Sequence, residues 1–277
     1  MTAARSLERH LVASAPVGGF PVVPMTRDAS RAFDAVIADY RAAQGFKRCT
    51  ARLITTDNDK LGKSDRPSYG LSLSPAATSG VWNLCPWSTP GCRGVCLASA
   101  GNGRYDSVTR ARRYRTLLLA DHSAAFVARM ADEIRARVRL DGPINFRANI
   151  ISDLRWELFA GGLMSIDGAA LYDYTKAPTH KRASLPNYRL VGSVSERDSD
   201  ETIRGKVDHF GSAAVALDLP KGAPLPAVLF GRPVVDGDLS DDRTMATEIG
   251  VVIGLRFKRP ANGMTAADSH GFVRSVA

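Results

Sequence analysis

The chain has 277 residues, of which 44% are hydrophobic and 23% are charged. This composition is close to the average for globular proteins, so it excludes a disordered tail and a collagen-like repeat. With 37 Lys and Arg residues against 28 Asp and Glu residues, the formal net charge is +9. Such an excess favours a polyanionic partner, most simply nucleic acid. A charge that only keeps the protein soluble is the alternative.

Two sequence features bear on the cellular compartment: membrane-spanning runs and a secretory signal. The chain has no run of 18 apolar residues, which predicts no spanning helix and no membrane partner. Residues 1–30 lack the apolar core of a secretory signal, so we expect a cytoplasmic protein. In a reducing compartment, its four cysteines indicate metal or redox chemistry rather than disulfides.

The first half of the chain alternates between ordered and irregular patterns. Gly and Pro residues interrupt residues 1–30, which we expect to be weakly ordered. The following elements are predicted from apolar periodicity: a helix over 31–44, strands over 47–55 and 69–75, a loop over 76–104, and helical segments over 107–120 and 122–140. The last two are either two helices or one helix broken near Asp121–His122.

The second half repeats short apolar runs that end in polar residues. These predicted strands cover 143–153, 170–176, 188–196, 213–219, 233–238 and 250–258, and helices are expected over 154–163, 199–211 and 241–249. Such alternation predicts an α/β fold with mainly parallel strands. We interpret it as a complete or partial (β/α) barrel, with a doubly wound open sheet as the alternative. The single barrel-like domain would span 31–259, followed by a C-terminal tail at 260–277.

The loop over 76–104 carries the strongest chemical motif, CPWSTPGCRGVC. Cys85, Cys92 and Cys96 have six and three residues between them. Three thiolates in a loop rich in Gly and Pro suit zinc or an iron–sulfur cluster, which favour soft sulfur ligands. Unrelated buried cysteines are the alternative. Cys49 lies 36 residues upstream of Cys85 and is either a fourth ligand or an isolated strand residue.

The position of these cysteines resembles the radical S-adenosylmethionine superfamily, in which a three-cysteine loop follows the first strand of a partial barrel. That resemblance implies a [4Fe–4S] cluster with one iron open to S-adenosylmethionine. The usual spacing in the superfamily is CxxxCxxC with an aromatic residue before the last cysteine. Here the spacing is Cx6Cx3C, and Val95 stands at that place. Zinc is the alternative metal.

The chain as a whole resembles a family of phage and plasmid proteins, the mycobacteriophage gene-product-88-like proteins. The resemblance rests on YGLSLSPAATSGVWNLCPWSTPGC, FRANIISDLRWE, LYDYTK, VVDGD and GVVIGLRFK, and it runs from about residue 47 to 259. It implies a phage or prophage origin, and hence the cytoplasm of the host cell, but it implies no activity.

Polar residues follow several predicted strands, where the carboxyl ends of parallel strands form the active-site face. We predict catalytic roles for Asp153, Asp173, Lys176, Glu196, Asp236 and Asp238. We predict cofactor-binding roles for Asn149, Ser152, Ser193 and Ser195. Helix caps and solvated turns are the alternative explanation, because Asp and Ser are common N-caps.

Arginines are concentrated just after the cysteine loop. Residues 101–140 contain nine arginines and four acidic residues. The planar guanidinium group binds phosphate oxygens in pairs. We therefore predict nucleic-acid contacts for Arg104, Arg110, Arg112, Arg113 and Arg115, with a solvated helical face as the alternative.

Three functions fit these patterns. The first is an enzyme that modifies nucleic acid, most simply a base of phage DNA, by radical S-adenosylmethionine chemistry. The second rests on a more distant resemblance to base-exchanging transglycosylases, which insert deazaguanines into tRNA or phage DNA. That resemblance implies Asp153, Asp173 or Asp236 as nucleophile or base. The third is a non-catalytic DNA-binding protein with structural zinc. The sequence does not define the target base, the product or the oligomeric state.

Overall fold

A computed structural model describes residues 4–47, 52–55, 64, 66–243 and 249–276. Cys49, and parts of the strand predicted over 47–55 and of the helix predicted over 241–249, lie outside the described residues. The chain divides into two compact units. Unit 1 comprises Met1–Asn58, Arg66–Pro86 and Tyr105–Leu171. Unit 2 comprises Asp59–Asp65, Trp87–Arg104 and Tyr172–Ala277.

Unit 1 contains three parallel strands in the order β2 (Ser68–Gly70), β4 (Ile144–Arg147) and β5 (Ala169–Thr175), the last of which continues into unit 2. All four residues of β4 are buried, as expected for a parallel strand that is covered on both faces. A separate parallel pair joins β1 (Arg5–Ser6) to β3 (Trp82–Asn83).

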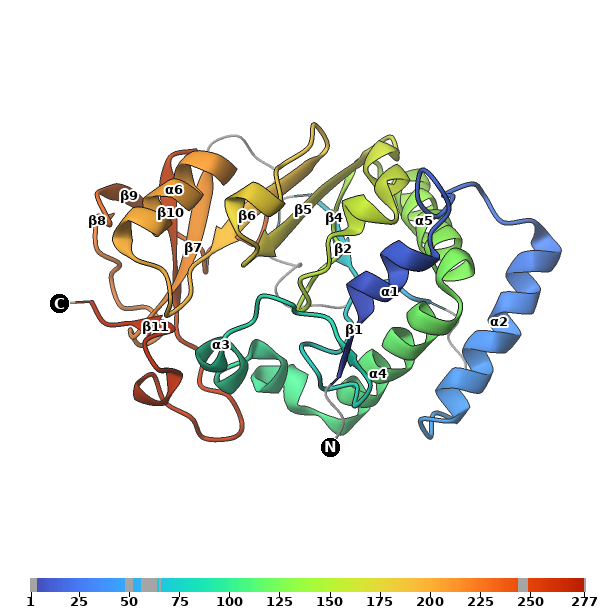
Figure 1. Ribbon diagram of the computed structural model, residues 1–277, viewed down its shortest axis with the longest axis horizontal. Coiled ribbons are helices and arrows are strands. Elements are labelled where there is room, and N and C mark those ends of the chain that lie inside the picture. The colour runs from blue at the N-terminus through green and yellow to red at the C-terminus, as the bar shows by residue number, and fades with distance from the viewer. Residues whose placement is uncertain (1–3, 48–51, 56–63, 65, 244–248, 277) are drawn as a thin grey trace. The chain divides into compact units, whose positions relative to one another are not determined.

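Among the described residues of unit 1, the α-helices are α1 (Leu7–Ser14), α2 (Arg27–Ala42), α4 (Asp106–Asp121) and α5 (Ser123–Asp141). Both α1 and α2 contact α4 (Figure 1). The side chain of Thr26 accepts a hydrogen bond from the Ala29 amide and so caps α2. The predicted break near Asp121–His122 is confirmed, because α4 ends there and a second helix begins.

Unit 2 contains a sheet in the order β6 (Tyr188–Ser193), β7 (Ser212–Leu217), β10 (Val251–Arg256), β9 (Arg232–Asp236) and β8 (Val228–Leu229). β11 (Val273–Arg274) pairs with β7. The pairs are parallel except for the β8–β9 hairpin. Helix α6 (Asp200–Phe210) begins at its cap Ser199 and ends at Gly211, whose φ of 84° suits glycine. Ile203 and Val207 of α6 pack into the core of the unit.

Short helical turns complete both units. They are α3 (Pro90–Gly94), η2 (Leu97–Ser99), η3 (Gly101–Arg104), η4 (Trp156–Leu158), η5 (Gly161–Ser165), η6 (Thr179–Lys181) and η7 (Ala267–Ser269). The two turns η4 and η5 replace the helix predicted over 154–163, since two adjacent glycines at 161 and 162 disfavour a continuous helix.

The α/β class with mainly parallel strands agrees with the sequence analysis, while closure into a barrel stays a prediction. The predicted domain bounds of 31–259 stay a prediction too. We expected weak order over residues 1–30, whereas the structure has β1 and α1 there, with Leu7 and Leu11 of α1 fully buried. The predicted tail at 260–277 contains η7 and β11. In the described part of the chain, no helix has the length and apolar character that crossing a membrane requires.

An ion pair between Glu8 of α1 and Arg155 ties the N-terminal segment into unit 1. The Glu8 carboxylate accepts from the Arg155 guanidinium at 2.7 Å and from its backbone amide at 2.9 Å. Glu8→Ala would remove the acceptor that these half-buried donors share, so we expect it to lower the free energy of unfolding by about 2 kcal/mol. Asp106→Ala removes the exposed ion pair with Arg110 and should leave the urea midpoint almost unchanged. Equal midpoints for the two variants would contradict this role.

Candidate functional site

The cysteine loop begins in unit 1, where Cys85 lies beside the segment that follows β4. The Cys85 thiol accepts a hydrogen bond from the Ala76 amide at 3.2 Å and donates to the Ile151 carbonyl at 3.7 Å. The Asp153 amide donates to the Leu84 carbonyl at 3.0 Å. Cys85 is therefore fixed at the carboxyl end of a parallel strand.

Asn149 determines the path of this segment after β4. Its side-chain oxygen accepts from the Ser152 hydroxyl, the Leu154 amide and the Trp156 indole, at 2.9, 3.0 and 3.3 Å. Its amide group donates to the Leu154 carbonyl at 2.9 Å. Asn149 and Ser152, which we predicted to bind a cofactor, thus hold the loop that faces Cys85.

The N-terminal segment contacts the residues that precede Cys85 in unit 1. The Arg5 amide donates to the Val81 carbonyl at 3.0 Å, and the Arg5 guanidinium lies 4.3 Å from the ring centre of Trp82. The ring of His10 lies against the same indole, with the ring centres 4.8 Å apart. Because Trp82 precedes Cys85 by three residues, these contacts fix the start of the loop.

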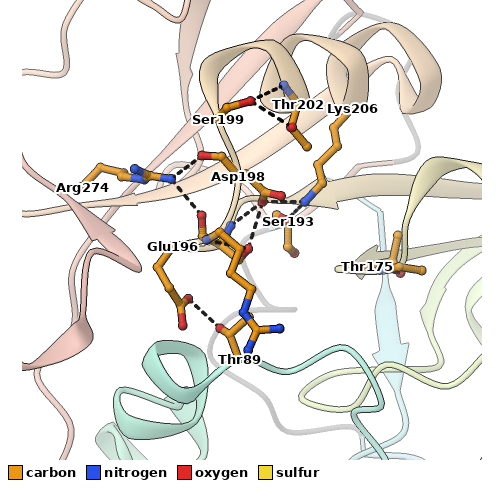
Figure 2. Close-up of polar contacts among 12 residues, drawn as sticks. Thr89, Thr175, Ser193, Glu196, Asp198, Ser199, Thr202, Lys206 and Arg274 are labelled. Atoms are coloured by element: carbon orange, nitrogen blue, oxygen red, sulfur yellow. Dashed lines mark hydrogen bonds and ion pairs between the residues drawn. The ribbon is translucent and has the colours of Figure 1, made fainter.

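In unit 2, the loop forms α3 beside the carboxyl end of β6. The Glu196 carboxylate accepts from the Thr89 hydroxyl at 2.6 Å (Figure 2). It also accepts from the Gly91 amide at 2.9 Å. Burial raises the pKa of Glu196, but the hydrogen bonds from Thr89 and Gly91 outweigh it and hold the pKa below its usual value. The carboxylate is therefore ionised at neutral pH and bonded to the cysteine loop.

The segment that carries Glu196 is itself fixed by buried ionic contacts (Figure 2). Lys206 donates to the Asp198 carboxylate at 2.6 Å and to the Ser193 carbonyl at 2.9 Å. Asp198 also accepts from the amide and hydroxyl of Ser195. Arg274 of β11 donates to the carbonyls of Ser195 and Asp198, both at 2.8 Å. Ser193 and Ser195, also predicted to bind a cofactor, take part in this support.

The C-terminal segment contacts the part of the cysteine loop that lies in unit 2. The Ala261 amide donates to the Ser99 carbonyl at 2.8 Å, and the Asn262 side chain donates to the Gly94 carbonyl at 3.2 Å. Gly91 packs directly against the backbone oxygen of Ser269. Residues that we expected to form a tail therefore help to hold the segment with Cys92 and Cys96.

Cys85, Cys92 and Cys96 are free thiols, and each is half-buried. Cys85 belongs to unit 1, and the other two belong to unit 2. Within the described ranges, no three His, Cys, Asp or Glu side chains are grouped as a metal ion requires. The donor chemistry of reduced, partly shielded thiols is that of a zinc or iron–sulfur site.

The four predicted catalytic residues of unit 2 other than Glu196 lie in different surroundings. Asp173 is fully buried and accepts from the Tyr188 hydroxyl at 2.6 Å, which in turn accepts from Arg182 at 2.6 Å. Lys176 is half-buried, and its ammonium lies 5.3 Å from the ring centre of Phe272. Phe272 also packs against Gly91, so Lys176 is near α3.

The other two, Asp236 and Asp238, share the guanidinium of Arg256, at 2.9 and 3.1 Å. Lys258 lies 3.5 Å from Asp238. The structure thus pairs both carboxylates with cations at the carboxyl ends of β9 and β10. In unit 1, the predicted catalytic residue Asp153 is buried.

The five predicted nucleic-acid arginines differ in exposure and in their contacts. Arg104 ends η3 in unit 2, whereas the other four lie on α4 in unit 1. Arg112 is buried and donates to the Ser72 hydroxyl, and Arg110 pairs with Asp106. Arg115 lies over the ring of Tyr114. Arg104 and Arg113 are exposed.

The family model for gene product 88 matches residues 45–275. The chain belongs to the gene product 88 family. The match includes the cysteine loop and the segments that hold it in unit 2, up to Arg274. Neither the curated proteins nor the solved structures contain a match to the chain.

Sequence reasoning missed Thr89, Lys206 and Arg274 in this gene product 88 protein. Thr89 had a local signal, because a threonine followed by Pro90 is typical of a helix N-cap with proline in the first turn. Lys206 and Arg274 had no local sequence signal, since their shared partner Asp198 lies 8 and 76 residues away in the chain, respectively.

The tight packing at Gly91 gives a test of how the family member holds its cysteine loop. A methyl group there would overlap the Ser269 oxygen and lie 2.9 Å from the Phe272 Cβ. We expect Gly91→Ala to lower the free energy of unfolding by about 2 kcal/mol. Gly205→Ala, in open space on α6, should raise it by roughly 0.5 kcal/mol. Thermal unfolding of both variants measures these two changes in stability. A Gly91→Ala variant more stable than the wild type would contradict the packing at Gly91.

The pairing of Asp238 predicts a pH dependence. Burial raises the pKa of Asp238, but the amide and guanidinium of Arg256, with Lys258, outweigh it and hold the pKa below the usual value. Because the folded-state pKa is lowered, the stabilisation is present above about pH 3.9 and is lost as the pH falls through the folded-state value. Asp238→Asn should therefore destabilise the protein at pH 7 and progressively less below pH 4, as measured by urea unfolding. The exposed Asp218 provides a control, Asp218→Asn, and a pH-independent effect of Asp238→Asn would contradict the prediction.

Proposed function

We propose that the protein is an enzyme that modifies nucleic acid, most simply a base of phage DNA, with the cysteine loop at its reaction centre. One observation carries the proposal. Each unit holds its own part of the loop at the carboxyl end of a parallel strand: Cys85 beside the segment after β4, and α3 against Glu196 after β6. In each unit, this is the end of the strands at which parallel α/β folds carry their active sites.

The proposal assigns the metal to the cysteine loop, on the basis of the spacing of Cys85, Cys92 and Cys96. A [4Fe–4S] cluster with S-adenosylmethionine would supply the one-electron reduction that starts radical chemistry. The role of the protein is then to shield the thiols and to hold the loop through Thr89 and Glu196. Lys176, which lies near α3, would orient an anionic group of the cofactor or substrate.

The nucleic-acid part of the proposal rests on charge. The net charge of +9 attracts a polyanion. Arg104 and Arg113 are exposed and suit phosphate contacts, whereas Arg112 is oriented toward Ser72. We place the reaction in the cytoplasm of the host cell, where thiols stay reduced.

Nucleoside analysis tests this function. The protein is expressed in a bacterial host, and the nucleosides of total DNA and RNA are compared by mass spectrometry. We expect a nucleoside of new mass with the wild type and with Cys49→Ala, and its loss with Cys92→Ala. Identical nucleosides in all three samples would contradict the enzyme. Salt-dependent DNA binding in that case would favour the non-catalytic alternative.

A further inference from the structure

Glu196 was predicted to be catalytic, but both of its carboxylate oxygens are bonded to the cysteine loop. One oxygen accepts from the Thr89 hydroxyl, and the other accepts from the Gly91 amide. Hydrogen bonds to an ionised carboxylate are stronger than those between neutral groups. The carboxylate therefore holds two adjacent points at the start of α3.

Thr89 transmits this restraint to a cysteine. Its hydroxyl donates to Glu196 and accepts from the Cys92 amide at 3.3 Å. Pro90, between them, has no amide hydrogen. Thr89 itself is buried, with 4% of its surface exposed. The backbone position of Cys92 thus depends on a chain of two hydrogen bonds that starts at Glu196.

The backbone on either side of Glu196 is also held in place by hydrogen bonds. The neighbouring carbonyls of Ser195 and Asp198 accept from Arg274, and Lys206 bonds to Asp198 with only 5% of its side chain exposed (Figure 2). A restraint is effective only if its own anchor does not move. The β6–α6 connection provides that anchor.

We infer that Glu196 is a positioning residue, which acts through Thr89 to fix Cys92 in the conformation that the reaction centre needs. The role of Cys92 as a metal ligand rests on the proposed function. The positioning itself rests on contacts within unit 2.

Site-resolved alkylation tests the inference. Protein purified anaerobically is treated with iodoacetamide, and the labelling rate of each cysteine is read from tryptic peptides and their fragment ions. We expect Glu196→Gln and Thr89→Val each to speed labelling of Cys92 on the order of tenfold, because each breaks a charge-assisted hydrogen bond. The double variant should add little to either, since both act on one chain of bonds. Thr89→Ser, which keeps the hydroxyl, should restore the slow rate.

Two controls separate positioning from loss of stability. Ser199→Ala removes the N-cap of α6, which bonds to Thr202, and should leave labelling of Cys92 unchanged. Labelling is carried out after any metal has been removed with a chelator, so that Cys85, in unit 1, serves as the internal reference and should keep its rate in every variant. Labelling of Cys92 within about twofold of wild type in Glu196→Gln would overturn the inference. The inference would also be overturned if Glu196→Gln raised the labelling rates of all cysteines equally. It would be overturned too if Ser199→Ala raised the labelling rate of Cys92 as much as Glu196→Gln does.

The outcome is independent of the proposed function. Wild-type protein without metal or activity would contradict that function, yet the labelling rates would still test whether Glu196 positions Cys92. If the wild type holds metal, Glu196→Gln should lose it faster to a chelator than Ser199→Ala. Equal rates of metal loss would count against positioning.

Discussion

The structure depends on one constraint: the cysteine loop has little regular structure of its own, so other residues must hold its backbone. Helix α3 has five residues and is too short to be stable alone. Its start is held by the Glu196 carboxylate through Thr89 and Gly91. Each of these bonds requires a precisely placed partner from a distant part of the chain. Much of the polar chemistry at the strand ends therefore serves to fix the loop.

Segments near both ends of the chain contribute to this support. In unit 1, Arg5 and His10 hold the indole of Trp82 ahead of Cys85. In unit 2, Asn262 bonds to the end of α3, and Arg274 fixes the segment that carries Glu196. Loss of either end would therefore affect the site before it affected the central strands. This explains why both ends are ordered in spite of their glycines and prolines.

The sequence predicted the elements whose signal is local. Buried runs such as 188–196 and 213–219 gave strands close to β6 and β7, and the helix break near His122 was located correctly. The sequence also found the polar residues at the strand ends, but not their roles. Asp173 and Asp236 are bonded to Tyr188 and Arg256, and no local pattern indicates such pairings. They are created only when distant segments fold together.

The central claim is that the cysteine loop is a metal centre, and metal analysis of anaerobically purified protein tests it most directly. The account predicts a brown protein that contains iron and acid-labile sulfide. Cys92→Ala should lose both the colour and the iron, while Cys49→Ala should retain them. Zinc in place of iron would keep the metal centre but exclude the radical chemistry. Wild-type protein without bound metal, or metal that persists in Cys92→Ala, would contradict the account.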